Sequence, residues 1–217
     1  MKDRQFAVIG LGRFGSSVAT TLSSLGYNVL AIDSSEQQVQ AIANEVTHAV
    51  QVDALDEDAL KALGIRNFDV VIVAIGEDIQ ANILVTVILK EIGVKYVIAK
   101  AKNNMHGKVL ERVGADKVVY PEKDMGIRVA YHLVSENILD FIELSPDYSI
   151  IEVVAPPEFV GKSIGKLNLR AQYGMSVLAI KKKDQIIADP GADSVIDEKD
   201  VLVFVGKNTS LSRFSRK

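Results

Sequence analysis

The sequence of 217 residues contains no cysteine. Disulfides, thiolate metal sites and cysteine nucleophiles are therefore excluded, and the composition is compatible with a reducing cytoplasm. No apolar run is long enough to cross a bilayer, so we expect no direct membrane insertion and any membrane role to depend on a partner. The first four residues lead directly into an apolar run, so we also expect no signal peptide.

An excess of positive charge is also lacking. The formal net charge is -3, which argues against a general nucleic-acid binder. The 48% of hydrophobic residues and the mixture of charges are typical of a globular protein. A chain of this length can form one large domain or two small ones.

Catalytic groups are scarce as well. The three histidines, His48, His106 and His132, lie outside any recognisable catalytic pattern, and we expect each to be structural or exposed. We find no Ser/His/Asp or paired-carboxylate arrangement in the C-terminal 70 residues, and the sequence contains no P-loop motif. The sequence therefore predicts a protein that is not an enzyme.

A glycine-rich motif follows the first apolar run. Residues 6–15 read F-A-V-I-G-L-G-R-F-G, and a helical pattern comes next. In this motif Gly10 permits a tight turn, Gly12 lets a pyrophosphate approach the backbone, and Gly15 lets the helix pack against the strand. Asp33 ends the next apolar run, where a ribose-binding acid belongs. The combination predicts a nucleotide site, and a glycine turn that binds nothing is the alternative.

Apolar runs alternate with helical patterns over roughly the first 120 residues, as in a complete Rossmann-type domain. The expected strands are 6–9, 28–32, 49–53, 69–75, 96–100 and 117–120, and the expected helices are 14–25, 34–45, 56–64, 79–91 and 104–113. The run at 69–75 is almost continuously apolar, as in a central parallel strand that is covered on both faces. We predict an α/β fold with a doubly wound parallel sheet.

The stretch 125–144 is apolar on more than one helical face. It predicts a crossover helix that packs between two lobes, against a second subunit, or both. The break at 145–147 separates an N-terminal nucleotide-binding domain, 1–144, from a C-terminal ligand-binding domain, 145–217. For the latter we predict a small α+β module, with strands at 149–155, 175–181, 185–188 and 201–206 and a short helix at 161–167.

Three charged residues lie near the expected crevice. Arg13, inside the phosphate turn, can reach a γ-phosphate or can be a solvated loop residue. Lys100 ends a strand and either faces the crevice or is an ordinary strand-end lysine. Asp53 can accept from an adenine amino group or can be solvated.

Four segments resemble the RCK (KTN) domain family, and in particular the cytosolic regulatory subunits of Ktr-type bacterial potassium-uptake systems. They are residues 6–15, residues 67–76, residues 114–116 together with 121–126, and residues 168–174. The resemblance implies a Rossmann-type N-lobe, a crossover helix and a C-lobe. It also implies a homo-octameric ring, built from dimers, that docks on a membrane potassium-translocating subunit. The protein would then be cytoplasmic and peripheral to the membrane, with ATP favouring the conducting ring and ADP the inactive one.

The resemblance also implies ligand sites. The nucleotide residues are Gly10, Gly12, Arg13, Phe14, Gly15, Asp33, Ser34, Asp53, Ala54, Ile75, Gly76 and Lys100. Glu122 would hold a divalent or monovalent cation between the nucleotides of two subunits, although alone it would be called a solvated helix-start charge. A cyclic di-AMP site between two C-terminal modules would use Ile164, Leu167, Asn168, Arg170, Ala171, Val177 and Pro190.

Two other functions remain open from the residues alone. Asp33 suits any adenosine ribose without a 2′-phosphate, so an NAD/NADH-binding redox sensor or a small NAD-dependent oxidoreductase is the main alternative. The missing proton donor opposes catalysis but does not oppose NAD sensing. A DNA-binding redox sensor is disfavoured by the acidic balance and by the lack of a winged-helix segment.

Overall fold

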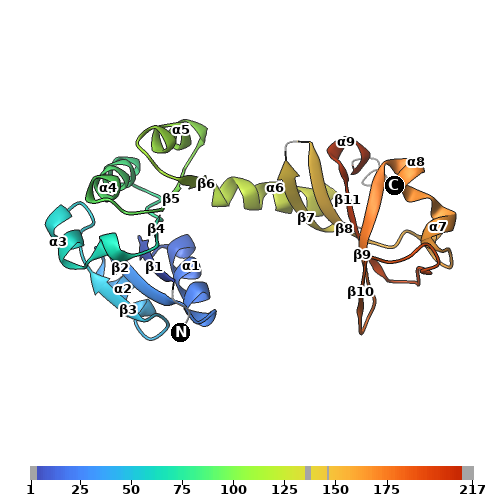
Figure 1. Cartoon of the computed structure of the whole chain (residues 1–217), viewed down its shortest axis with the longest axis horizontal. Coiled ribbons are helices and arrows are strands. Elements are labelled where there is room, and N and C mark those ends of the chain that lie inside the picture. The colour runs from blue at the N-terminus through green and yellow to red at the C-terminus, as the bar shows by residue number, and fades with distance from the viewer. Residues whose placement is uncertain (1–3, 135–137, 146, 212–217) are drawn as a thin grey trace. The chain divides into compact units, whose positions relative to one another are not determined.

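The computed structural model describes residues 4–134, 138–145 and 147–211. Contacts divide the chain into two compact units, Met1–Glu122 and Lys123–Lys217, each with its own sheet (Figure 1). In the described part of the chain, no helix has the length and apolar character needed to cross a membrane.

The first unit contains a six-stranded parallel sheet with the order β3-β2-β1-β4-β5-β6. Its strands are β1 (Gln5–Ile9), β2 (Asn28–Asp33), β3 (His48–Gln51), β4 (Val70–Val73), β5 (Val97–Lys100) and β6 (Lys117–Val119). This order confirms the predicted doubly wound sheet. The chain reverses its direction of winding between β1 and β4, and ligands bind at such a point outside the carboxyl ends of the strands.

Helices cover both faces of this sheet. They are α1 (Arg13–Ser24), α2 (Glu36–Ile42), α3 (Glu57–Ala62), α4 (Ile79–Ile92) and α5 (Asn104–Arg112), with a 3₁₀ helix η1 (Ile65–Asn67). Alternate residues of β1 enter two separate cores, Ala7 and Ile9 one of them, Phe6 and Val8 the other. A central strand covered on both faces has this pattern.

The predicted crossover helix is shorter than expected. Helix α6 spans Pro121–Val134, and β7 spans Ile138–Ser145 and pairs antiparallel with β8 (Tyr148–Val154). The prediction of one helix through residue 144 was therefore wrong. In β7 the side chain of Phe141 is buried whereas Ile142 and Leu144 are exposed, so the apolar residues beyond α6 serve a strand. Contacts place most of α6 and all of β7 in the second unit, which differs from the predicted division after residue 144.

The second unit contains a five-stranded antiparallel sheet with the order β10-β9-β11-β8-β7. Its other elements are β9 (Met175–Lys181), β10 (Ile186–Ala188), β11 (Val201–Lys207), a 3₁₀ helix η2 (Pro157–Phe159), α7 (Ile164–Leu167), α8 (Leu169–Tyr173) and α9 (Asn208–Leu211). The α+β prediction is confirmed, while β7 and α8 were not predicted. Phe141, Ile151 and Phe204 lie in the core of this unit.

Candidate functional site

A cavity of about 500 Å³ lies at the carboxyl ends of β1, β2 and β4 and beside the loop after β3. It gathers eight of the predicted nucleotide residues: Gly10, Gly12, Asp33, Ser34, Asp53, Ala54, Ile75 and Gly76. The remaining lining residues come from the same strand ends and from α2 and α4: Ile9, Gln38, Val52, Leu55, Ala74, Glu77, Asp78, Ala81 and Val85. The cavity therefore lies where a doubly wound sheet binds a nucleotide.

The three glycines of the motif have different surroundings. Gly10 has a φ of +92°, and a Cβ there would lie 2.9 Å from the backbone nitrogen of Ile75. A Cβ on Gly15 would lie 1.8 Å from the carbonyl oxygen of Gly10, so α1 can approach the turn only with glycine at this position. A Cβ on Gly12 would meet no atom within 4 Å. Gly10 and Gly15 are thus required by the fold, whereas the space at Gly12 is open to a ligand.

Asp33 connects the end of β2 to the glycine turn. Its Oδ2 accepts a hydrogen bond from the backbone N–H of Leu11 at 2.6 Å, and its Oδ1 accepts one from the N–H of Ser35 at 2.8 Å. A carboxylate has about four acceptor positions, so both oxygens can still accept from ribose hydroxyls. The side chain can therefore shape the turn and bind a ribose at the same time.

Lys100 and Glu122 form an ion pair beside the cavity. The distance from Lys100 Nζ to Glu122 Oε1 is 2.6 Å, and the two side chains are 13% and 69% exposed. The same Nζ lies 5.9 Å from the centre of the Phe14 ring. The hydrogen bond from Lys100 holds the pKa of Glu122 below its ordinary value, against a smaller opposing effect of burial. Arg13, at the start of α1, is exposed.

Glu122 was predicted to hold a cation. The described residues include no group of three or more His, Cys, Asp or Glu side chains that could hold a metal ion. A cation at Glu122 would therefore need further ligands such as phosphate oxygens, as the prediction assumed. The cation site stays a prediction.

Sequence reasoning missed Asn82, which is fully buried on α4. Its Nδ2 donates to the carbonyl oxygen of Ile75 at 2.6 Å and to that of Lys100 at 3.1 Å, so it ties the chain after β4 to the end of β5. Two carbonyl acceptors require the NH₂ group to face them. The Oδ1 atom then faces the core without a hydrogen-bond partner among the described residues. The only signal in the sequence was an asparagine in the middle of a largely apolar helix, in which Gln80 is a second amide.

Two of the three histidines, His48 and His106, lie in exposed or structural positions as predicted. His106 is buried, its Nδ1 accepts a hydrogen bond from the backbone N–H of Lys102 at 3.2 Å, and burial lowers its pKa. His48 is exposed at the start of β3. The side chain of His132 lies outside the described part of the chain.

The predicted cyclic di-AMP residues lie in the second unit. Five of them are on consecutive short helices and the residue between them: Ile164, Leu167, Asn168, Arg170 and Ala171. Asn168 has a φ of +43° and joins α7 to α8. Asn168, Arg170 and Ala171 are exposed, Leu167 is buried, and Ile164, Val177 and Pro190 are half-buried. These residues include the arginine and the apolar side chains that the prediction requires, and the cyclic di-AMP site stays a prediction.

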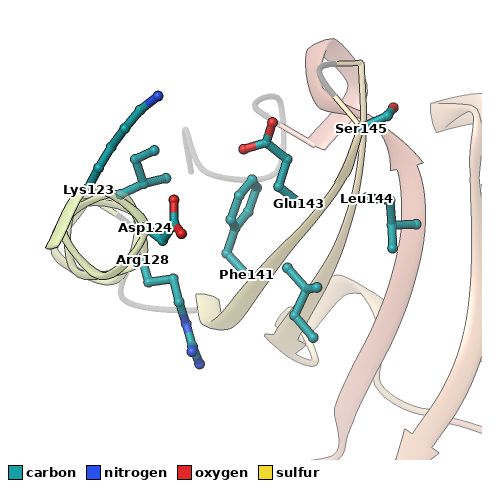
Figure 2. A pocket seen from close by; sticks show the side chains of 9 residues that line it. Lys123, Asp124, Arg128, Phe141, Glu143, Leu144 and Ser145 are labelled. Atoms are coloured by element: carbon teal, nitrogen blue, oxygen red, sulfur yellow. The ribbon is translucent and has the colours of Figure 1, made fainter. Parts of the chain in front are cut away.

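A second cavity of about 500 Å³ lies in the second unit. Figure 2 shows Phe141 and Glu143 pointing into the space between β7 and α6. On the helix side, Arg128 Nη2 pairs with Asp140 Oδ1 at 2.8 Å. None of the predicted site residues lines this cavity.

Known protein families match a large part of each unit. The TrkA-N domain model matches residues 6–121, and the TrkA-C domain model matches residues 148–217. The chain belongs to the RCK family. Among its RCK relatives, Ktr system potassium uptake protein C of Bacillus subtilis (strain 168) is 48% identical over 99% of this chain and 97% of its own length. Ktr system potassium uptake protein A of Vibrio alginolyticus is 38% identical over 97% of this chain and 96% of its own length.

Solved RCK structures share the fold. A structure of the GsuK channel aligns with a TM-score of 0.70 at 19% identity and covers 100% of this chain. A structure of the GsuK channel bound to NAD aligns with a TM-score of 0.68, also at 19% identity, and covers 99% of this chain. The chain spans 40% of the length of each of these channel chains. At this level of identity the likeness shows the fold alone.

Proposed function

We propose that this RCK chain is the nucleotide-sensing regulatory subunit of a Ktr-type potassium-uptake system. The observation that carries the proposal is the cavity at the glycine turn, which combines an open backbone at Gly12 with the carboxylate of Asp33. The Ktr system potassium uptake proteins align with nearly the whole chain, so both units contribute to the likeness. The chain would act in the cytoplasm on a membrane potassium-translocating subunit, as a homo-octameric ring.

ATP and ADP are the nucleotides that we propose. The ribose would bind Asp33, the phosphates would approach Gly12 and the first turn of α1, and Arg13 would meet the γ-phosphate. A ligand shifts a conformational equilibrium only through its different affinity for two states, and ATP and ADP differ by that phosphate. A cation near Glu122 would bridge phosphates of neighbouring subunits. The described site offers no proton donor or nucleophile in a catalytic arrangement, so we propose binding without turnover.

NAD(H) is the second candidate ligand. Asp33 suits the adenosine ribose of NAD equally well, and NAD is the ligand in the GsuK structure described above. In the second unit, cyclic di-AMP remains the proposed ligand. Arg170 is exposed and can pair with a phosphodiester, and the half-buried Ile164 and Val177 can flank an adenine.

Nucleotide binding to the purified protein tests the proposal. ATP, ADP, NAD and NADH are titrated by calorimetry, while light scattering reports the size of the assembly. We expect an octamer that binds ATP and ADP and changes shape between them. A dimer or tetramer that strongly prefers NADH would refute ATP/ADP sensing.

The role of Arg13 has its own test. Arg13→Ala should lose affinity for ATP more than for ADP, since only ATP has the γ-phosphate. Arg112→Ala, an exposed arginine in the last turn of α5, is the control. Equal losses for both nucleotides in Arg13→Ala would refute the γ-phosphate contact.

A further inference from the structure

A long loop connects β10 to β11 in the second unit. It comprises residues 189–200, all of which the structure describes, and we call it the β10–β11 loop. Apart from a single antiparallel bridge between Val195 and Ser163, it contains neither helix nor strand. Pro190, one of the predicted cyclic di-AMP residues, lies near its start. Because the loop has no ladder of backbone hydrogen bonds of its own, its contacts with other elements decide where Pro190 lies.

The middle of this loop lies against α7, the helix that begins with Ile164. The backbone N–H of Ile164 donates to the carbonyl oxygen of Ser194 at 3.0 Å. The backbone N–H of Gly165 donates to the carbonyl oxygen of Ala192 at 2.8 Å. A Cβ on Gly165 would lie only 3.0 Å from that oxygen, so the helix and the loop approach each other closely. The position of the loop and that of the start of α7 are therefore coupled.

Lys182 holds the other end of the loop. This residue follows β9, and its Nζ donates to the carbonyl oxygen of Val195 at 3.4 Å, to Asp200 Oδ2 at 3.0 Å and to Asp197 Oδ2. An ammonium group has three donors, so these acceptors use its full capacity. The hydrogen bond to Asp197 raises the pKa of Lys182 above its ordinary value, against a smaller opposing effect of burial. One side chain thus connects the end of β9 to three residues of the loop.

Lys182 also compensates a buried charge. The side chain of Asp200 is 5% exposed and that of Lys182 is 20% exposed, whereas that of Asp197 is 68% exposed. Asp200 Oδ2 accepts a second hydrogen bond, from the backbone N–H of Asp197 at 2.8 Å. A buried carboxylate that loses its partner destabilises the fold strongly. Lys182 therefore does two things that an experiment can separate: it neutralises Asp200, and it holds the backbone at Val195.

We infer that Lys182 is a positioning residue for the ligand site of the second unit. By holding Val195 it keeps the β10–β11 loop against α7, and so keeps Ile164 and Pro190 in the arrangement that receives the ligand. The inference rests on the proposed cyclic di-AMP site, and Lys182 acts there without touching the ligand. When its contact is removed, the loop must be ordered at the moment of binding, and this ordering costs affinity.

Two variants of the full chain separate positioning from charge compensation. Lys182→Met removes the contact and the counter-charge together, so it should lower the melting temperature and weaken cyclic di-AMP binding about tenfold. A double variant that adds Asp200→Asn removes the uncompensated charge and keeps a carbonyl acceptor for Asp197. It should recover most of the melting temperature. Its affinity in calorimetry should stay about tenfold below that of the wild type, because the contact with Val195 is still missing.

Hydrogen exchange supplies a local readout. In the double variant the backbone amides of Ile164 and Gly165 should exchange faster than in the wild type, because their acceptors lie in the loop that Lys182 no longer holds. The amides of β11 should exchange as they do in the wild type. A residue that only stabilises the whole unit would change the exchange of both groups together. The comparison therefore decides the inference even where the double variant recovers little stability.

The matched control is Lys183→Met, since Lys183 is the next residue along the chain and its side chain is exposed. It should keep the melting temperature and the cyclic di-AMP affinity of the wild type. Asp200→Asn alone measures the effect of the second substitution by itself, and the double variant is compared with it.

The outcomes distinguish the inference from the proposed function. If the double variant recovers wild-type affinity together with its melting temperature, Lys182 only compensates a buried charge, and the inference is wrong. If the amides of Ile164 and Gly165 exchange as in the wild type, Lys182 does not position the loop, and the inference is wrong as well. If the wild type does not bind cyclic di-AMP, the proposed ligand fails, whereas the exchange of these two amides still decides whether Lys182 holds the loop.

Discussion

The carboxylate of Asp33 accepts a hydrogen bond from the backbone N–H of Leu11 at 2.6 Å, across 22 positions in the sequence. Leu11 lies between the first two glycines of the motif, so the end of β2 holds the turn that follows β1. The second carboxylate oxygen accepts from Ser35. The acid that a sequence pattern assigns to ribose binding is therefore also a part of the binding turn before any ligand arrives.

Asp33 should consequently affect both stability and binding. Asp33→Ala leaves two backbone N–H groups without their acceptor, which should lower the free energy of unfolding by about 1–3 kcal/mol. ADP affinity should fall at least about tenfold, because the ribose contact and the turn are both lost. Asp33→Asn keeps one carbonyl acceptor, so its free energy of unfolding and its ADP affinity should lie between those of the wild type and those of Asp33→Ala. Chemical denaturation and calorimetry measure these effects.

Asp58→Ala is the control for the two Asp33 variants, since the side chain of Asp58 is 98% exposed. Its free energy of unfolding and its ADP affinity should equal those of the wild type. Normal stability in Asp33→Ala would show that the turn does not depend on its carboxylate.

Substitutions of two glycines of the motif should have separate effects, one on the stability of the fold and the other on ADP binding. Gly15→Ala would place a Cβ 1.8 Å from the carbonyl oxygen of Gly10, so α1 must move away from the turn and the protein should unfold at a clearly lower temperature. Gly12→Ala meets no atom within 4 Å and should keep the wild-type melting temperature. It should still lose ADP binding, because the added methyl group occupies the place that we assign to the phosphates.

Gly126→Ala is the matched control, as a Cβ there also meets no atom within 4 Å. It should retain both stability and binding. Full ADP affinity in Gly12→Ala would show that the phosphates do not approach this turn.

Asn82 should stabilise the backbone that lines the cavity, because its amide donates to the carbonyl oxygens of Ile75 and Lys100. Asn82→Leu keeps the branched shape and the number of side-chain heavy atoms but leaves the carbonyl oxygens of Ile75 and Lys100 without their donor, so it should destabilise the protein by about 2 kcal/mol. ADP affinity should fall as well, because Ile75 lines the cavity. Thermal unfolding and ADP titration measure the two effects.

Thr86→Val provides the comparison for a buried polar group on the same helix. Thr86 Oγ1 donates only to the carbonyl oxygen of Asn82, at 2.8 Å. That carbonyl keeps its place in the helix without the hydroxyl, so the cost should be smaller. An equal or greater loss in Thr86→Val would refute the special role of the Asn82 amide.

Local patterns predicted much of this fold. The continuous apolar run at 69–75 indicated a central strand, and β4 lies there, buried along its length. The glycine turn and Asp33 were predictable because each depends on a short segment and a fixed spacing. Strand β7 was missed because its apolar residues continue the pattern of α6, and a short apolar run does not distinguish a strand from a helix.

The rest of the site depends on contacts between distant segments. From the residues alone, Glu122 would be called a solvated helix-start charge, and Lys100 could either face the crevice or be an ordinary strand-end lysine. Only the parallel order of β5 and β6 brings the two together. Asn82 differs from its apolar neighbours in α4, but the sequence does not show that two strand ends meet its side chain. Side-chain pairing across a sheet is set by tertiary packing and leaves no periodic signal.

The ion pair between Lys100 and Glu122 should be visible in the titration of the carboxyl group. The hydrogen bond from Lys100 holds the pKa of Glu122 below its ordinary value of 4.5. A carboxyl group whose pKa is lower in the folded than in the unfolded chain stabilises the fold above the unfolded value, and this stabilisation disappears as the pH falls through the folded value. Because Glu122 is mostly exposed, solvent screens the pair, and the stability change should be small.

The titration itself is therefore the better measurement. In a carbon-13 NMR titration of the side-chain carboxyl groups, the pKa of Glu122 should rise in Lys100→Met relative to the wild type. Lys95→Met removes a lysine whose side chain is 72% exposed and lies 3.9 Å from Asp69, and it should leave the titration curve of Glu122 unchanged. If Lys100 contributes to the nucleotide site as predicted, addition of ADP to the wild type should shift the same signal, because the phosphates then compete with Glu122 for the ammonium group. Identical titrations of Glu122 in the wild type and in Lys100→Met would show that the pair does not form in solution.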